Sequence, residues 1–172
     1  SIKLIMKNSA TNTQDIFQDQ LKNFKALLAG SKMAKLSAIL LAVFSLVTAF
    51  KFRSNLEQAI PLLIGAIIQI VYTIKYLQVS DIKQKSYTQM SLQSSVSKFK
   101  EYMSNRKKYE MPVMALYAIT LIPFALSNKS VSFVISVGVL GIALVSFLGM
   151  LAFKKVDSNI ALLEATLKNE LH

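Results

Sequence analysis

The longest uncharged apolar run in the chain extends from Val131 to Phe153 and is closed by the pair Lys154 and Lys155. Apolar runs of about 18 residues or more are typical of membrane-spanning helices, because about 20 helical residues cross the hydrocarbon core of a bilayer. At about 1.5 Å per residue this run is about 34 Å long, enough to span with some tilt. It predicts one membrane span, so the other apolar runs must also be considered as possible membrane spans.

The composition agrees with a membrane protein of one domain, expected to cover residues 1–172. The chain is 53% hydrophobic and only 17% charged, against a usual charged share of about 25%. Cysteine is absent, which excludes disulfides and thiolate metal sites. The first long apolar run begins only at Leu36, so we expect no cleavable signal peptide.

Three further apolar runs predict three more spans. The second contains Pro61 in its expected first turn, and the third is interrupted by Pro123 near its outer end. The expected spans are residues 36–52, 59–77, 109–126 and 131–153. The first also carries small residues on one face, which would let a neighbouring helix approach closely. These small residues are Ala34, Ala38, Ala42, Ser45 and Ala49.

Polar segments outside the spans contain apolar residues at helical spacing. They predict amphipathic helices at residues 13–29, 88–106 and 156–171, the first capped by Asn12 or Thr13. Gly30 and Ser31 either kink the chain after the first helix or let one long helix run through. Each apolar stripe needs a surface to bury against. The stripes either pack on one another, with the segment after Leu77 as a fourth partner, or one of them binds a soluble protein or another protomer. The first choice for such a partner-binding stripe is Ile160, Leu163 and Leu167.

The basic residues predict an orientation. Four spans place both termini and the 78–110 loop on one side of the membrane. Of the 20 Lys and Arg residues, only Lys51, Arg53 and Lys129 fall on the opposite side, which leaves 17 on the first. Cytoplasmic loops carry such an excess. We therefore expect both termini to be cytoplasmic, in a bacterial inner membrane. The net charge is +11. Because the basic residues flank apolar blocks, the expected partner is the lipid bilayer and not nucleic acid.

The most polar side chains within a predicted span are Gln69, Tyr72 and Thr73. This patch could line a path or bind a polar ligand. Alternatively, Gln69 hydrogen-bonds across to a neighbouring helix, an interaction worth about 0.6 to 2 kcal/mol in a membrane.

A second candidate site is a basic collar at the predicted inner boundary. Such a collar can bind anionic lipid or a partner, with about 1 kcal/mol from each basic residue near an anionic surface. It can also simply anchor the topology, together with interfacial tyrosines. The collar residues are Lys75, Arg106, Lys107, Lys108, Lys154 and Lys155.

Motifs for catalysis are missing. The one histidine is the last residue, His172, and the chain has no GxSxG and no Gly-rich phosphate loop. We therefore expect no enzyme, no cofactor and no metal. The spans are read as free of Asp and Glu, which argues against a proton-coupled transporter. The expected role is that of an accessory, scaffold or signalling membrane protein acting through its cytoplasmic helices. The alternative is a channel or transporter component with the polar patch around Gln69.

The run from Val131 to Phe153 contains two lines of small residues about 140° apart, at about 100° per residue. A helix that faces lipid on most sides has little need of both. We therefore expect the fourth span to be a central packing element that touches two neighbours. The lines are Gly138, Gly141 and Gly149 on one side and Ser132, Ser136, Ala143 and Ser146 on the other.

The layout resembles a family of small, uncharacterised bacterial membrane proteins with four spans. The resemblance rests on the polar helix of residues 15–28, the exit VSDIKQKS at 79–86 and the Lys-rich segment SKFKEYMSNRKKYE at 97–110. Many members carry tryptophan near the N-terminus, and this chain has none. The resemblance implies two hairpins joined by a loop helix, and it implies no catalytic residue.

Overall fold

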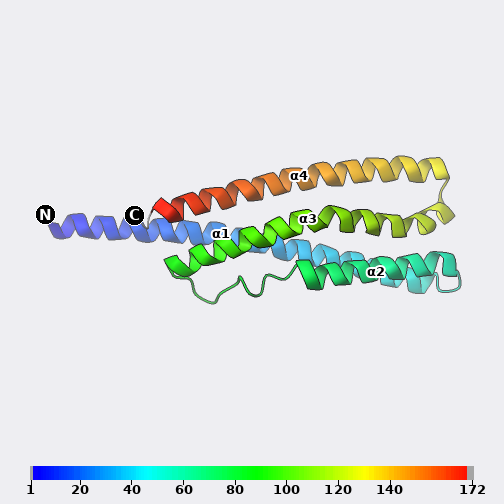
Figure 1. Cartoon of the computed structure of the whole chain (residues 1–172), viewed down its shortest axis with the longest axis horizontal. Helices are drawn as coiled ribbons and strands as arrows, with labels where there is room; N and C mark the ends of the chain where they lie inside the picture. The colour runs from blue at the N-terminus through cyan, green and yellow to red at the C-terminus, as the bar shows by residue number, and fades with distance from the viewer. Residues whose placement is uncertain (1, 170–172) are drawn as a thin grey trace.

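The computed structural model describes the backbone of residues 2–169 and the side chains of residues 14–127 and 129–168. Its helices are α1 (Ile2–Lys51), α2 (Leu56–Tyr76), α3 (Gln89–Asn128) and α4 (Val131–Asn169). Helices that follow one another in the chain pack antiparallel (Figure 1). The predicted all-α, antiparallel four-helix bundle is confirmed.

The bundle has two halves that differ in what covers their apolar side chains. Both hairpin turns lie at one end, and the start of α1 and the end of α4 lie toward the other (Figure 1). In the half that contains the turns, large apolar side chains such as Phe50 and Leu140 are exposed. Each of the four helices is long and apolar enough to cross a membrane. We call residues 36–52, 56–76, 109–128 and 131–152 the membrane half, and residues 14–35, 77–108 and 153–168 the stalk.

The stalk has a closed apolar core. The predicted stripes of α1, α3 and α4 are buried against one another, as in a soluble helical bundle. The aromatic ring of Phe24 packs edge-on against that of Phe99, with centroids 5.9 Å apart. The prediction that the stripes pack together is confirmed. Members of the core include Phe24, Leu28, Leu92, Val96, Phe99, Met103, Ile160, Leu163 and Leu167.

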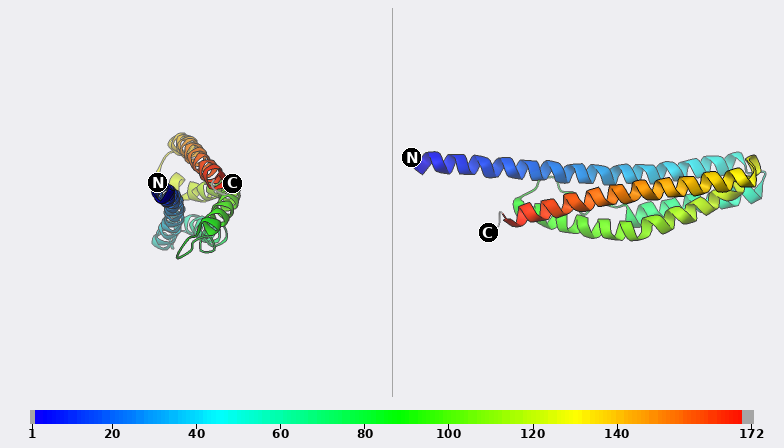
Figure 2. Two further views of the ribbon diagram at one scale, coloured as in Figure 1. Left: turned by 90° about the vertical axis from the view of Figure 1, so that its left-hand side faces the viewer. Right: turned by 90° about the horizontal axis from the view of Figure 1, so that it is seen from above.

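Three of the four helices run without a break from the stalk into the membrane half. In α1 the helix continues through Gly30, so the second of the two readings for this position is correct. The helix starts at Ile2, and the predicted start near Thr13 is wrong. The predicted loop helix and third span form one helix, α3, which bows along its length (Figure 2). It contains Pro112 and Pro123, and each lacks the amide hydrogen for the i−4 carbonyl, which favours bending of a helix.

α2 alone stops at the junction of the two halves. It starts at Leu56, so Pro61 is its sixth residue and not part of its first turn. Residues 77–88 after it are irregular, but they still cover the stalk core with the buried side chain of Ile82. The predicted fourth partner of the stalk is therefore present without being a helix. Thr88 then caps α3, because its Oγ1 accepts from the Ser91 amide at 3.3 Å while the Ser91 hydroxyl accepts from the Thr88 amide at 2.8 Å.

Close packing in the membrane half is concentrated between α1, α2 and α3. The predicted stripe of small residues on α1 is buried at Ala38, Ala42, Ser45 and Ala49. On α2, Gly65 is buried, and Thr120 of α3 lies directly against its backbone. Small side chains therefore bring these helices together, as expected in a bilayer.

The expected central role of α4 is wrong for its membrane half. Gly138, Gly141 and Gly149 have no non-local atom within 4 Å of a Cβ placed on them. Residues 131–151 are exposed or half-exposed throughout, and the end-on view shows α4 diverging from the other helices (Figure 2). α4 is instead held by its stalk residues, where larger side chains such as Phe153 and Ile160 enter the core. The predicted C-terminal helix does continue directly from the span, and Leu171 and His172 lie outside the described residues.

Candidate functional site

An ion pair lies between the membrane half and the stalk. Arg106 and Glu110 are one turn apart on α3, so their side chains face the same way. The guanidinium donates through Nε to Glu110 Oε2 and through Nη2 to Oε1, the latter at 3.2 Å. The two side chains are only 15% and 20% exposed. A bidentate pair of this kind, largely removed from solvent, fixes the geometry of both groups.

This ion pair joins three helices. The Tyr72 hydroxyl of α2 donates to Glu110 Oε2 at 3.2 Å. The Arg106 guanidinium lies over the ring of Phe153 on α4, 5.4 Å from its centroid. One turn before Arg106, the hydroxyl of Tyr102 is buried without a hydrogen-bond partner. The cluster therefore locks α2, α3 and α4 in register where the stalk begins.

Sequence reasoning missed this pair. The expectation that the spans contain no Asp or Glu fails at Glu110, which lies inside the predicted third span of 109–126. Arg106 was placed on the lipid-facing collar, but its side chain points into the bundle. The signal that was available is the four-residue spacing of Arg and Glu just before an apolar run.

The predicted polar patch lies on the buried face of α2. Gln69 is fully buried, and its Nε2 donates to the sulfur of Met114 on α3 at 3.9 Å. Its Oε1 and the hydroxyl of Thr73 have no hydrogen-bond partner. Tyr72 belongs to the ion-pair cluster. Gln69 therefore makes a weak contact between two helices, which agrees with the alternative in which it hydrogen-bonds to a neighbouring helix.

A second polar contact in the membrane half was not anticipated. Ser45 Oγ on α1 lies 2.9 Å from the Tyr117 hydroxyl on α3. The same hydroxyl donates to the carbonyl oxygen of Leu41 at 3.3 Å. Tyr117 was missed because a single tyrosine inside an apolar run carries no periodic signal. It ties α3 to the stripe of small residues on α1.

Replacing Gly65 by alanine should destabilise the membrane half. The new Cβ would lie 2.4 Å from Thr120 Oγ1 and 3.3 Å from Tyr117 Cε2. Thr120 cannot turn away freely, because its hydroxyl donates to the Tyr117 carbonyl at 2.6 Å. Overpacking of this kind costs about 1–3 kcal/mol. Thermal unfolding of the detergent-solubilised protein measures the loss.

Gly138→Ala is the matched control for Gly65→Ala. A Cβ at Gly138 meets nothing within 4 Å, and alanine is the better helix former by up to about 1 kcal/mol. The melting temperature should therefore stay the same or rise. Equal losses at Gly65 and Gly138 would contradict the observed packing of α2 on α3.

The other collar residues lie on the surface. Lys75 and Lys108 lie over the rings of the tyrosines that follow them, at 5.4 Å and 5.5 Å. Lys107 pairs with Asp157 of α4 at 3.0 Å. Lys154 and Lys155 are exposed. The collar therefore keeps five of its six predicted members on the surface.

The predicted partner-binding stripe is not free. Ile160, Leu163 and Leu167 are each buried in the stalk core. Their apolar surface is already covered by α1 and α3, so a partner cannot bind it in this conformation. The exposed side of α4 at this level presents Leu162 instead.

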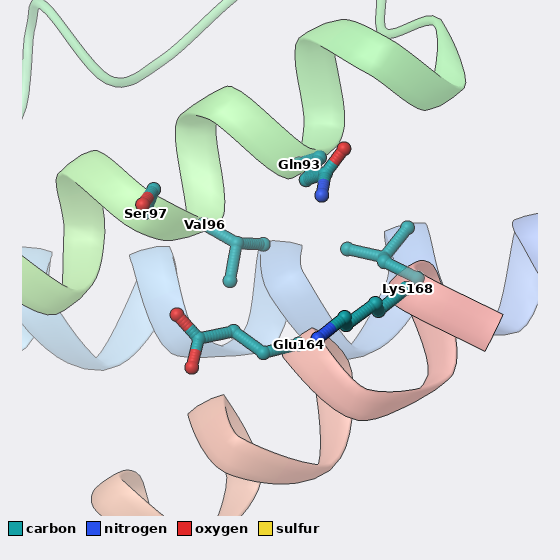
Figure 3. A pocket seen from close by; sticks show the side chains of 6 residues that line it. Gln93, Val96, Ser97, Glu164 and Lys168 are labelled. Atoms are coloured by element: carbon teal, nitrogen blue, oxygen red, sulfur yellow. The ribbon is translucent and has the colours of Figure 1, made fainter. Parts of the chain in front are cut away.

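The stalk also has an open pocket of about 240 Å³ between α3 and α4. Gln93 and Ser97 line it from α3, and Glu164 and Lys168 line it from α4 (Figure 3). Glu164 pairs with Lys100 at 2.7 Å beside it. Within the described side chains, no three His, Cys, Asp or Glu residues are grouped closely enough to hold a metal ion.

Comparison of the chain with family models, with curated proteins and with solved structures finds no match in any of the three. The resemblance to small bacterial four-span proteins is therefore supported only at the level of four long apolar helices. What the fold defines is a helical membrane protein whose bundle continues outside the membrane half as a packed stalk.

Proposed function

We propose that the chain is a non-enzymatic scaffold or signalling protein of the membrane, which holds a rigid stalk at the cytoplasmic face and presents its surface to a soluble partner. The observation that carries this proposal is the continuity of α1, α3 and α4 from the membrane half into the stalk. A displacement in the membrane half would be transmitted along these unbroken helices.

The stalk surface suits a protein partner. Because the core residues are buried within the chain, the stalk needs no partner in order to fold. Four large apolar side chains remain exposed on it: Leu162 on α4, Met90 at the start of α3, and Ile16 and Met33 on α1. Basic residues outnumber acidic ones along the stalk. An acidic protein surface with a small apolar contact is the chemistry that fits.

Photo-crosslinking in native membranes tests this proposal. A photoreactive residue replaces Leu162 or Met90 in the full chain, and Ser54 in the exposed hairpin turn is the control position. The proposal expects the same soluble protein at both stalk positions and not at Ser54. It also expects Leu162→Asp to remove the product formed at Met90. Stalk positions that capture only lipid or membrane proteins, from a correctly folded chain, would overturn it.

A further inference from the structure

Two lysines lie at the start of the stalk part of α4, just after its membrane half. Lys154 and Lys155 follow Phe153 directly, and both side chains are exposed. Within the described part of the chain, neither lysine forms an ion pair. They therefore present uncompensated positive charge at the boundary between apolar and polar surface.

The acidic groups nearby are already engaged. Asp157 lies three residues after Lys154, on the same face of α4, but it pairs with Lys107 of α3 at 3.0 Å. Glu110 is held by Arg106 inside the bundle. Lys154 and Lys107 therefore flank a single carboxylate at the seam between α3 and α4. Positive charge is in excess at this seam.

The surface just beyond these lysines is apolar and uncovered. Phe147, Leu148, Met150 and Leu151 are all exposed on α4. In a bilayer this surface lies at the depth of acyl chains, while the lysines lie at the depth of phosphates. The two neighbouring surfaces match the two parts of a phospholipid.

From this arrangement we propose an anionic phospholipid site at the stalk-side boundary of α4. Lys154 and Lys155 contact the phosphate and the anionic headgroup, with Lys107 held nearby by its ion pair with Asp157. The acyl chains lie along the open face of α4, which no other helix covers within the part of the chain that the structure describes. Charge complementarity selects this occupant, because a zwitterionic lipid offers no net charge to the lysines. The site is independent of the proposed function.

Native mass spectrometry of the full chain in neutral detergent tests the site. The protein is titrated with phosphatidylglycerol or with phosphatidylcholine. The wild-type chain should bind phosphatidylglycerol at least 10-fold more tightly. Two lysines near an anionic group together raise the binding affinity about 30-fold. Lys154→Gln with Lys155→Gln should therefore weaken phosphatidylglycerol binding by about that factor and leave phosphatidylcholine binding unchanged.

The matched control is Lys51→Gln with Lys129→Gln, which removes two exposed lysines at the opposite boundary. This control should keep the phosphatidylglycerol preference. An equal loss in both double variants would overturn the site, as would equal wild-type affinity for the two lipids. Inorganic phosphate should not displace the lipid. Displacement by millimolar phosphate would assign the lysines to a soluble anion and overturn the lipid proposal.

Discussion

Leu163→Ala should open the stalk while the membrane half keeps its fold. Leu163 is 3% exposed and lies in the core formed by α1, α3 and α4. Truncating a buried leucine costs about 2–5 kcal/mol, because transfer free energy is lost and a cavity is left. Each 1.4 kcal/mol is a factor of ten. Hydrogen exchange of the stalk amides should therefore accelerate about 100-fold, while exchange in residues 56–76 stays slow.

The neighbouring residue provides the control. Leu162 has the same side chain on the same helix, but it is 62% exposed. Surface substitutions away from special features change stability by no more than about 0.5 kcal/mol. Leu162→Ala should therefore leave stalk exchange unchanged. Similar acceleration in both variants would mean that the stalk core does not exist as described.

Removing one partner of the ion pair between Arg106 and Glu110 should cost about 3–5 kcal/mol, because the remaining charge stays buried without compensation. Arg106→Met leaves Glu110 in contact with Tyr72 alone among its present partners. The expected result is a large fall in the melting temperature of the detergent-solubilised protein. It should be accompanied by faster exchange at the junction of the two halves.

Two further variants separate burial from charge. Arg106→Met with Glu110→Leu removes both charges and should recover most of the stability, because a buried pair can be replaced by apolar residues of similar volume. Lys107→Met breaks the pair with Asp157, whose side chains are 57% and 52% exposed. That loss should be below about 1 kcal/mol. Equal losses for Arg106→Met and Lys107→Met would contradict the buried position of Arg106.

Periodicity and charge-free length predicted most of the fold. The run from Val131 to Phe153 and the stripe containing Leu163 are long signals. The run forms the first part of α4 and leaves its apolar side chains exposed or half-exposed as far as residue 151, while the stripe is buried in the stalk core. The continuity of the helices was harder to predict, because Gly30 and Pro112 disfavour a helix locally. Packing on both sides of these positions outweighs that cost.

The candidate site was predicted only in part. Gln69 stands out in an apolar run, so its burial could be anticipated. Glu110 has no such contrast, because it follows a Lys-rich segment and reads as part of a solvated loop. The position of α4 was misjudged for a related reason. Small residues such as Gly138 permit close approach without requiring it, so sequence alone did not show which helix would use them.

We propose that the chain crosses a membrane, with both hairpin turns on one side and the stalk on the other. The chain has no cysteine, so Ser54→Cys in the first turn and Ser158→Cys in the stalk each give a single label site, and both positions are exposed. A membrane-impermeant maleimide added to intact cells should label Ser54→Cys alone. Ser158→Cys should react only after the membrane is opened. Labelling of both cysteines in intact cells, or of neither until lysis, would contradict this topology.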